Sequence, residues 1–232
     1  MMTTCLLEEG DISYHILTTE HTNEALMVLA RAFCDDPACH ALNERPSTTI
    51  KIALDDWVEY LDYWMDSCVE NGISVVAIDV VKHSVVGVMA NRHLLDNPDK
   101  FLKEYCSMQH TKALTPWNEL AYFFEEESAK QLPELREPCK TADLIYLGVH
   151  ENYRRKNIAN NLVRASLPLF KKAGYKFATL EATNFYTSQI AQRNDFERIH
   201  RYDIKTWVKE GKTIFDNVKE PHGMFEYWVK RL

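Results

Sequence analysis

The sequence predicts an α/β protein built on a mixed sheet with helices on its faces, and three observations support this fold class. Residues 142–150, ADLIYLGVH, form a nearly continuous apolar run, which is typical of a buried central strand. Residues 157–173 repeat apolar side chains at helical spacing and stop at Gly174. Residues 11–17 and 223–231 alternate apolar and polar side chains, as half-buried strands do.

The other elements follow from apolar periodicity, capping residues and the prolines and glycines that end them. The first is a helix over 23–33, capped by Thr19 or Thr22 and ending before Pro37, and a second helix runs from Ser47 or Thr48 to Glu70. A hairpin of 73–80 and 84–94 follows, with its turn near Lys82-His83, and then a helical insert over about 97–138. The remaining elements are a strand over 175–183, a short helix over 186–195 and a strand over 197–207.

Length and composition indicate an ordinary globular protein. The chain has 232 residues, 46% hydrophobic and 26% charged, which suits one domain with an insertion or at most two small domains. We expect a single domain over 1–232. Its 27 basic and 34 acidic residues give a net charge of −7. This charge disfavours nucleic acid and anionic membranes as partners and mildly favours a cationic substrate.

The cysteine pattern and the N-terminus favour an intracellular, cytoplasmic protein. None of the six cysteines forms a CxxC pair, so we expect reduced thiols rather than a disulfide framework. The first residues, MMTTCLLEEGDISYH, lack the basic and apolar regions of a signal peptide, and no apolar run is long enough to span a membrane. The nine histidines show no metal-ligand spacing with cysteine or carboxylate partners, so we expect no metal. Nothing in the sequence indicates an oligomeric state.

A turn between the central strand and the helix over 157–173 carries three cations, Arg154, Arg155 and Lys156. Cations at a helix start are repelled by the helix dipole, whereas the unpaired N–H groups there bind phosphate well. This pairing of cations and oriented amides indicates an anionic ligand, although a solvated basic turn would have the same sequence. The phosphate-binding patterns GxxxxGK[ST] and GxGxxG are both absent.

The spacing R-x-x-N-x-A from Arg154 resembles the Q/R-x-x-G-x-G/A loop of the GNAT acetyltransferases, whose amides hold the pyrophosphate of acetyl-CoA. Here Asn157 and Ala159 replace the two glycines; asparagine tolerates positive φ better than most residues. Asn184 and Asp195-Phe196 also resemble later motifs of that family. The similarity covers residues 140–200 well and continues more weakly, through element order, from residue 10 to the end.

The resemblance implies a GNAT fold in which the strand ending at Val149 splays away from the strand that starts at Tyr175. The gap would receive the pantetheine arm, and an amide at or near Val149 would polarise the thioester carbonyl. The implied acetyl-CoA-binding residues are Leu147, Gly148, Val149, Arg154, Arg155, Lys156, Asn157, Ile158, Ala159, Asn184 and Tyr186.

The segment 31–43, RAFCDDPACHALN, resembles the F-x-x-D-E-P-L segment of insect arylalkylamine N-acetyltransferases, where the Glu before Pro is the proposed general base. The matching residue is Asp36, with Glu44 as a weaker candidate. The alternative is that Asp35 and Asp36 only end a helix, which the helix dipole disfavours.

The resemblance leaves the general acid open. The family's usual tyrosine, seven residues after the asparagine, is replaced by Ala191. Thr183 and Thr187 are catalytic candidates through their hydroxyls, although either could simply cap a helix. Tyr186 is a third candidate, and His150 could relay a proton from the end of the central strand.

These observations predict an acetyl-CoA-dependent N-acetyltransferase acting on an arylalkylamine or another small biogenic amine, by direct attack in a ternary complex. Two alternatives stay open. One is acetylation of protein lysines or N-termini by the same fold. The other is an acyl-CoA-binding protein without catalysis, which the losses at Asn157 and Ala191 would favour.

Overall fold

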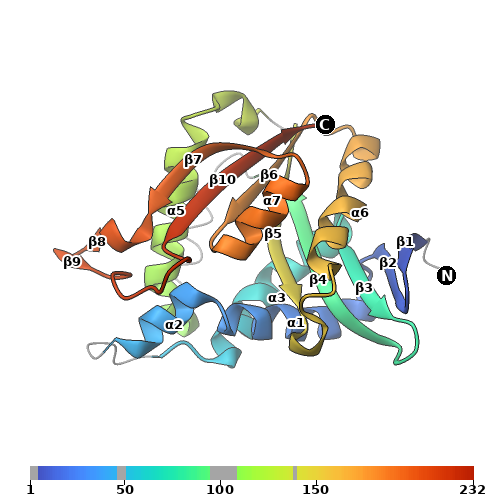
Figure 1. Cartoon of the computed structure of the whole chain (residues 1–232), viewed down its shortest axis with the longest axis horizontal. Helices are drawn as coiled ribbons and strands as arrows, with labels where there is room; N and C mark the ends of the chain where they lie inside the picture. The colour runs from blue at the N-terminus through green and yellow to red at the C-terminus, as the bar shows by residue number, and fades with distance from the viewer. Residues whose placement is uncertain (1–4, 46–50, 95–108, 138–139) are drawn as a thin grey trace.

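The computed structural model describes residues 5–45, 51–94, 109–137 and 140–232. Within them it contains one large sheet covered by helices on both faces (Figure 1). The helices are α1 (Thr22–Cys34), α2 (Pro37–Glu44), α3 (Leu54–Glu70), α5 (Thr115–Ala129), α6 (Ile158–Ala173) and α7 (Phe185–Arg193). The strands are β1 (Cys5–Glu9), β2 (Ile12–Ile16), β3 (Val75–Asp79), β4 (Ser84–His93), β5 (Thr141–Val149), β6 (Phe177–Ala182), β7 (Glu197–Asp203), β8 (Val208–Lys209), β9 (Lys212–Thr213) and β10 (Met224–Arg231).

Eight strands form the main sheet in the order β1-β2-β3-β4-β5-β6-β10-β7, and β8 and β9 form a separate ribbon. All pairings in the sheet are antiparallel except that of β5 with β6, which is parallel. The predicted mixed α/β sheet is therefore confirmed, as are the hairpin of β3 and β4 and the helix α6 ending at Gly174.

Two apolar clusters fill the two sides of the sheet. One packs α1, α2, α3 and α5 against residues such as Tyr146, Phe225 and Tyr227. The other packs α6 and the end of α7 against residues such as Leu144 and Leu180. Side chains of β5 and β6 therefore pack into the cores on both sides of the sheet, as expected for strands buried on both faces.

The structure corrects several predicted elements. The first helix ends before Pro37 as predicted, but Pro37 begins a further helix, α2, that was not predicted, and neither were β1, β8 and β9. The second helix begins at Leu54 rather than near residue 48; the proposed caps Ser47 and Thr48 lie outside the described residues. Its first turn is held instead by Asp56, which accepts a hydrogen bond from the N–H of Ala53 at 2.7 Å.

The predicted insert over 97–138 is described only from residue 109 onward, and there it includes α5. This helix lies beside β7 and β10 (Figure 1) and contributes Trp117, Leu120 and Phe124 to the first core. The insert thus packs on the sheet face that also holds α1 and α3.

Four cysteines lie in the described residues, at positions 5, 34, 39 and 68, and all four are free thiols. Cys106 and Cys139 lie outside those residues. Among the described helices, none has both the length and the apolar character needed to cross a membrane.

Candidate active site

A cavity of about 160 Å³ opens between the sheet and the helices α1, α3 and α5. It lies beside the point where β5 and β6 separate. The two strands pair from Thr141 to Leu144 against Phe177 to Leu180, after which β5 pairs only with β4 and β6 only with β10. The predicted splay is therefore present, and it leaves one edge of β5 without a strand partner among the described residues.

Asp36 lines this cavity and is only 6% exposed. It is the N-cap of α2: one carboxylate oxygen accepts a hydrogen bond from the N–H of Ala38 at 2.9 Å. Proline at the first helical position completes a typical helix start. The alternative that Asp35 and Asp36 merely end a helix is thus wrong for Asp36, whose charge lies at the favourable end of α2.

Burial raises the pKa of Asp36 to about 6, although the N–H of Ala38 and the amide of Asn184 act in the opposite direction. A carboxylate with this pKa is mostly ionised at neutral pH and accepts a proton more readily than an exposed aspartate does. Position and basicity both suit a general base.

Asn184 connects Asp36 to the start of α7. Its side-chain nitrogen donates to Asp36 at 3.2 Å, and its oxygen accepts hydrogen bonds from the N–H groups of Tyr186 and Thr187, each at 3.1 Å. Asn184 is therefore the N-cap of α7, so neither Thr183 nor Thr187 has the capping role that was the alternative for them. Both threonines line the cavity, and the Thr187 hydroxyl donates to Asn184 at 3.2 Å.

Leu147, Gly148 and Val149 form the end of β5, on the stretch that β6 does not accompany. Leu147 lines the cavity. A Cβ atom on Gly148 would lie 3.0 Å from the Cβ of Ala32 and 3.2 Å from the Cα of Leu29, so glycine lets α1 pack directly on this strand. This contact holds the end of β5 against α1, the helix that precedes Asp36 in the chain.

The turn after β5 has the predicted backbone geometry. Asn157 adopts the left-handed conformation at φ 61° and is the N-cap of α6 without a side-chain cap, and Arg155 also has a positive φ of 63°. The first N–H groups of α6 consequently meet no capping side chain. Ile158 is buried, whereas Ala159 is partly exposed.

The three cations of this turn are all exposed. Arg154 forms an ion pair with Asp35 at 2.7 Å, and the Lys156 ammonium lies 4.8 Å from the centre of the Tyr153 ring. Arg154 thus has a protein partner that the sequence did not indicate.

Three other candidates do not line the cavity with Asp36. Tyr186 is 65% exposed and lies against the His222 ring. His150 accepts a hydrogen bond from the N–H of Asn152 and lines a different cavity, and Glu44 lies 3.7 Å from Lys219. Ala191, which replaces the family's tyrosine, is fully buried.

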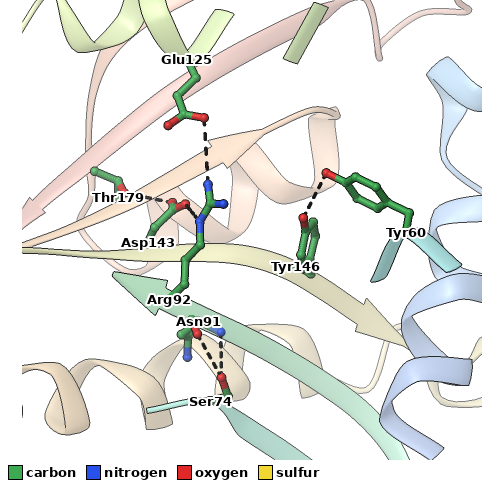
Figure 2. Close-up of polar contacts among 8 residues, drawn as sticks. All are labelled: Tyr60, Ser74, Asn91, Arg92, Glu125, Asp143, Tyr146 and Thr179. Carbon is green, nitrogen blue, oxygen red and sulfur yellow. Dashed lines mark hydrogen bonds and ion pairs between the residues drawn. The ribbon is translucent and has the colours of Figure 1, made fainter. Parts of the chain in front are cut away.

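The inner end of the cavity contains a charged network that sequence reasoning missed. Arg92, 6% exposed, lies between two carboxylates (Figure 2). Its side chain donates to Asp143 at 3.1 Å and lies 4.0 Å from Glu125 of α5. Thr179 of β6 donates to the other oxygen of Asp143 at 3.0 Å. Burial alone would lower the pKa of Arg92, but these carboxylates more than compensate and raise it.

Glu181 adds a third carboxylate to this end of the cavity. Burial, followed by the charges of Glu125 and Asp143, raises its pKa well above the ordinary value. Tyr60 and Tyr146 line the same space, and their hydroxyls lie 3.1 Å apart (Figure 2). A signal for this network existed in the sequence, since Arg92, Asp143 and Glu181 each interrupt an otherwise apolar strand.

Sequence comparison gives no relative for this chain: no family model matches it, and no curated protein matches it significantly. Solved structures do match. Arylalkylamine N-acetyltransferase 2 from Aedes aegypti superposes with a TM-score of 0.76 at 20% identity, covering 96% of this chain and 99% of that one. A polyamine N-acetyltransferase from Drosophila melanogaster gives 0.71 at 16% identity, covering 96% and 100%.

The chain has the GNAT acetyltransferase fold. A more distant structure with this fold, the NatC complex bound to Gag peptide and CoA, matches with a TM-score of 0.50 at 10% identity, covering 96% of this chain and 99% of that one. In this GNAT fold the cavity, Asp36 and the splay of β5 from β6 lie together. The described residues contain no group of three or more side chains suited to a metal ion.

Proposed function

We propose that this protein is an acetyl-CoA-dependent N-acetyltransferase for small primary amines, of the arylalkylamine or another biogenic type. The observation that carries the proposal is the buried Asp36 carboxylate, whose pKa is about 6, in a cavity beside the diverging strands. We further propose that residues 1–232 form one domain, since strands from Cys5 to Arg231 share one sheet. We also propose that the protein is cytoplasmic.

The residues present fit acetyl-CoA. The uncapped start of α6, with Asn157 in the left-handed conformation, offers backbone N–H groups for a pyrophosphate, and Arg154, Arg155 and Lys156 supply charge beside it. The free edge of β5 from Leu147 to Val149 offers backbone partners for the pantetheine arm.

When bound, acetyl-CoA supplies a thioester whose carbonyl carbon gains a bond to the amine nitrogen and loses its bond to sulfur. Asp36 takes up the proton that the cationic amine must lose before it can attack, and the second proton that the nitrogen loses goes to the departing thiolate, which leaves as the thiol of coenzyme A. A backbone N–H at Leu147–Val149 stabilises the oxygen that becomes negative. Thr183 and Thr187 supply hydroxyls that line the same cavity, and Asn184 holds the Asp36 carboxylate in place.

The size of the cavity favours a small amine over a protein substrate. At about 160 Å³ it is smaller than the pockets of roughly 300–1,000 Å³ that hold drug-sized ligands. The side chains of α5, including Trp117 and Tyr122, line it on one side. A peptide would have to displace these side chains, whereas a short amine would not.

The test is thiol release from acetyl-CoA in the presence of a panel of arylalkylamines, alkylamines and polyamines, with peptide N-termini and lysine peptides as competitors. We expect turnover with at least one small amine, and Asp36→Ala should lower kcat with little effect on the KM for acetyl-CoA. Binding of CoA without turnover on any amine or peptide would favour a non-catalytic acyl-CoA-binding protein instead.

A further inference from the structure

The hairpin that joins β3 to β4 ends at the same corner of the molecule as the turn between β5 and α6. The start of β4 pairs with the end of β5, and the N–H of His150 donates to the carbonyl of Val86 at 2.9 Å. The Tyr153 hydroxyl donates to Asp79, the last residue of β3, at 2.6 Å. Two segments 74 residues apart are therefore fixed side by side.

Asp79 also fixes the tip of this hairpin. Its carboxylate accepts hydrogen bonds from the N–H groups of Val81 and Lys82, each at 2.9 Å, in addition to the one from Tyr153. Such bonds from an aspartate to the backbone of the residues that follow it hold a turn in one conformation. The Lys82 side chain therefore extends from a hydrogen-bonded turn of defined position.

Two ammonium groups lie against the ring of Tyr153. Those of Lys82 and Lys156 are 5.1 Å and 4.8 Å from its centre. The Tyr153 side chain is buried and anchored through its hydroxyl, and contact with this hydroxyl raises the pKa of Lys82, which stays charged. Two like charges held at one ring repel each other, and an anion bound beside both would remove that repulsion.

Most cations of this corner have no acidic partner. The hairpin tip and the turn before α6 together carry four of them, Lys82, Arg154, Arg155 and Lys156. Among the described residues only Arg154 forms an ion pair, with Asp35, and the other three are exposed. Glu151 of the same turn is exposed and pairs with none of them. In a protein of net charge −7, such a local excess of cations favours a strongly negative ligand.

The proposed cofactor carries its negative charge in two places on one ribose, a pyrophosphate on the 5′ side and a phosphate monoester on the 3′ oxygen. The start of α6 is the proposed site of the pyrophosphate. A group that binds the 3′-phosphate must therefore lie close to that helix start. Lys82 meets this condition, because Lys156, the residue before the N-cap Asn157, shares the Tyr153 ring with it.

We propose that Lys82, with Lys156 beside it, binds the 3′-phosphate of coenzyme A, so that the tip of the β3–β4 hairpin is part of the cofactor site. This inference rests on the proposed acetyltransferase function, because it extends the cofactor site of the same reaction. A phosphate monoester carries close to two negative charges at neutral pH and suits two ammonium groups. Lys82 thereby distinguishes coenzyme A from dephospho-coenzyme A and from carrier-bound phosphopantetheine, which both lack this phosphate.

The experiment is calorimetry with coenzyme A and dephospho-coenzyme A, which differ only in the 3′-phosphate. We expect the wild-type protein to bind coenzyme A about tenfold more tightly, the usual effect of one charge-assisted contact. Lys82→Met removes the charge and keeps most of the side-chain length. It should weaken the binding of coenzyme A about tenfold and leave that of dephospho-coenzyme A unchanged. Equal affinity of the wild-type protein for the two ligands would overturn the proposal.

Two further variants separate a specific contact from a general effect of charge. Lys172→Met removes the same charge from the exposed last turn of α6, about 20 Å from the start of that helix, and should leave both affinities unchanged. Arg154→Ala should weaken both ligands alike, because both contain the pyrophosphate. If Lys82→Met weakens both ligands equally, or behaves like Lys172→Met, the assignment of the 3′-phosphate to Lys82 is wrong.

Thiol release with the amine panel, measured on the same protein, separates this inference from the proposed function. If Lys82→Met removes the preference for coenzyme A, the 3′-phosphate site stands even when no amine is acetylated. If an amine is acetylated but the two ligands bind equally well, the acetyltransferase function stands and the 3′-phosphate site is refuted. If neither ligand binds, both proposals fail. Unfolding temperatures of each variant confirm that it is folded.

Discussion

Replacing Asp36 with asparagine should make the protein more stable and less active, and both effects follow from the burial of one carboxylate. Burial raises its pKa from the ordinary 3.8 to about 6. Each pH unit between two pKa values corresponds to about 1.4 kcal/mol, so ionising Asp36 in the folded protein costs about 3 kcal/mol. Asparagine is an equally good N-cap and carries no charge, so α2 keeps its bond to the N–H of Ala38.

The sign of the pH dependence follows from proton binding. Between about pH 4 and pH 6 the folded protein keeps the Asp36 proton while the unfolded chain has lost it, so wild-type stability falls as the pH rises through this window. The asparagine side chain of the variant does not titrate. The stability of Asp36→Asn relative to wild type should therefore increase by about 2 kcal/mol from pH 4 to pH 7, because at pH 4 the unfolded chain has already lost most of this proton. The lost hydrogen bond from Asn184 subtracts a pH-independent amount of about 1 kcal/mol.

Urea unfolding of both proteins from pH 4 to pH 8 measures this difference, and thiol release measures kcat in parallel. We expect kcat to fall by about 10²–10⁴-fold, the usual contribution of a general base. A stability difference that stays constant across this pH range would refute the argument that Asp36 is a buried, raised-pKa carboxylate. A variant with unchanged kcat would remove Asp36 from the mechanism.

Three other substitutions examine the turn and the strand beside the cavity. Arg154→Ala should raise the KM for acetyl-CoA about tenfold, whereas Asp35→Ala, which removes only the partner seen at 2.7 Å, should not; an unchanged KM in Arg154→Ala would exclude a phosphate contact. Gly148→Ala should lower the free energy of unfolding by about 1–3 kcal/mol, because its Cβ would lie 3.0 Å from that of Ala32; calorimetric unfolding temperatures equal to wild type would contradict this. Asn157→Val should cost about 1–3 kcal/mol at φ 61° while Asn157→Gly is tolerated, and urea unfolding midpoints that coincide for the two variants would show that the turn is not strained.

The part of the fold that the sequence predicted best lies between residues 140 and 205. There each element has a strong local signal: an apolar run for β5, helical spacing and Gly174 for α6, and alternation for β6 and β7. The resemblance to the GNAT loop, in which Asn157 replaces a glycine, also led us to expect the positive φ at Asn157. Elements whose signals are short or shared between neighbours, such as β1 and the ribbon of β8 and β9, were missed.

Asp36-Pro37 shows why a correct residue can be chosen with an incorrect structural picture. The pair was interpreted as the end of one helix, because a residue before proline is disfavoured in helical conformation. The same pair also begins a helix, since aspartate is a good N-cap and proline a good first residue. The resemblance selected Asp36, but only the structure shows that it is buried at the start of α2.

The acidic end of the cavity required information that no local pattern contains. Arg92, Asp143 and Glu181 come from three neighbouring strands, and their proximity depends on the register of β4 with β5 and of β5 with β6. Glu125 comes from α5, and nothing in its sequence indicates the sheet face on which that helix packs. Charged residues within apolar strands could have been singled out, but their partners could not.

The properties that make Asp36 suitable as a base arise from two opposing influences that meet at one carboxylate. The start of α2 and the N–H of Ala38 stabilise its charge, whereas burial destabilises it and is the larger influence. The resulting pKa leaves Asp36 ionised at neutral pH and makes it roughly a hundredfold stronger as a base than an exposed aspartate. Asn184 then fixes this carboxylate to the start of α7, 148 residues further along the chain. The proposed base is therefore positioned by two helix starts at once, and a change that shifts either α2 or α7 should alter the proposed acetyl transfer before it alters the fold.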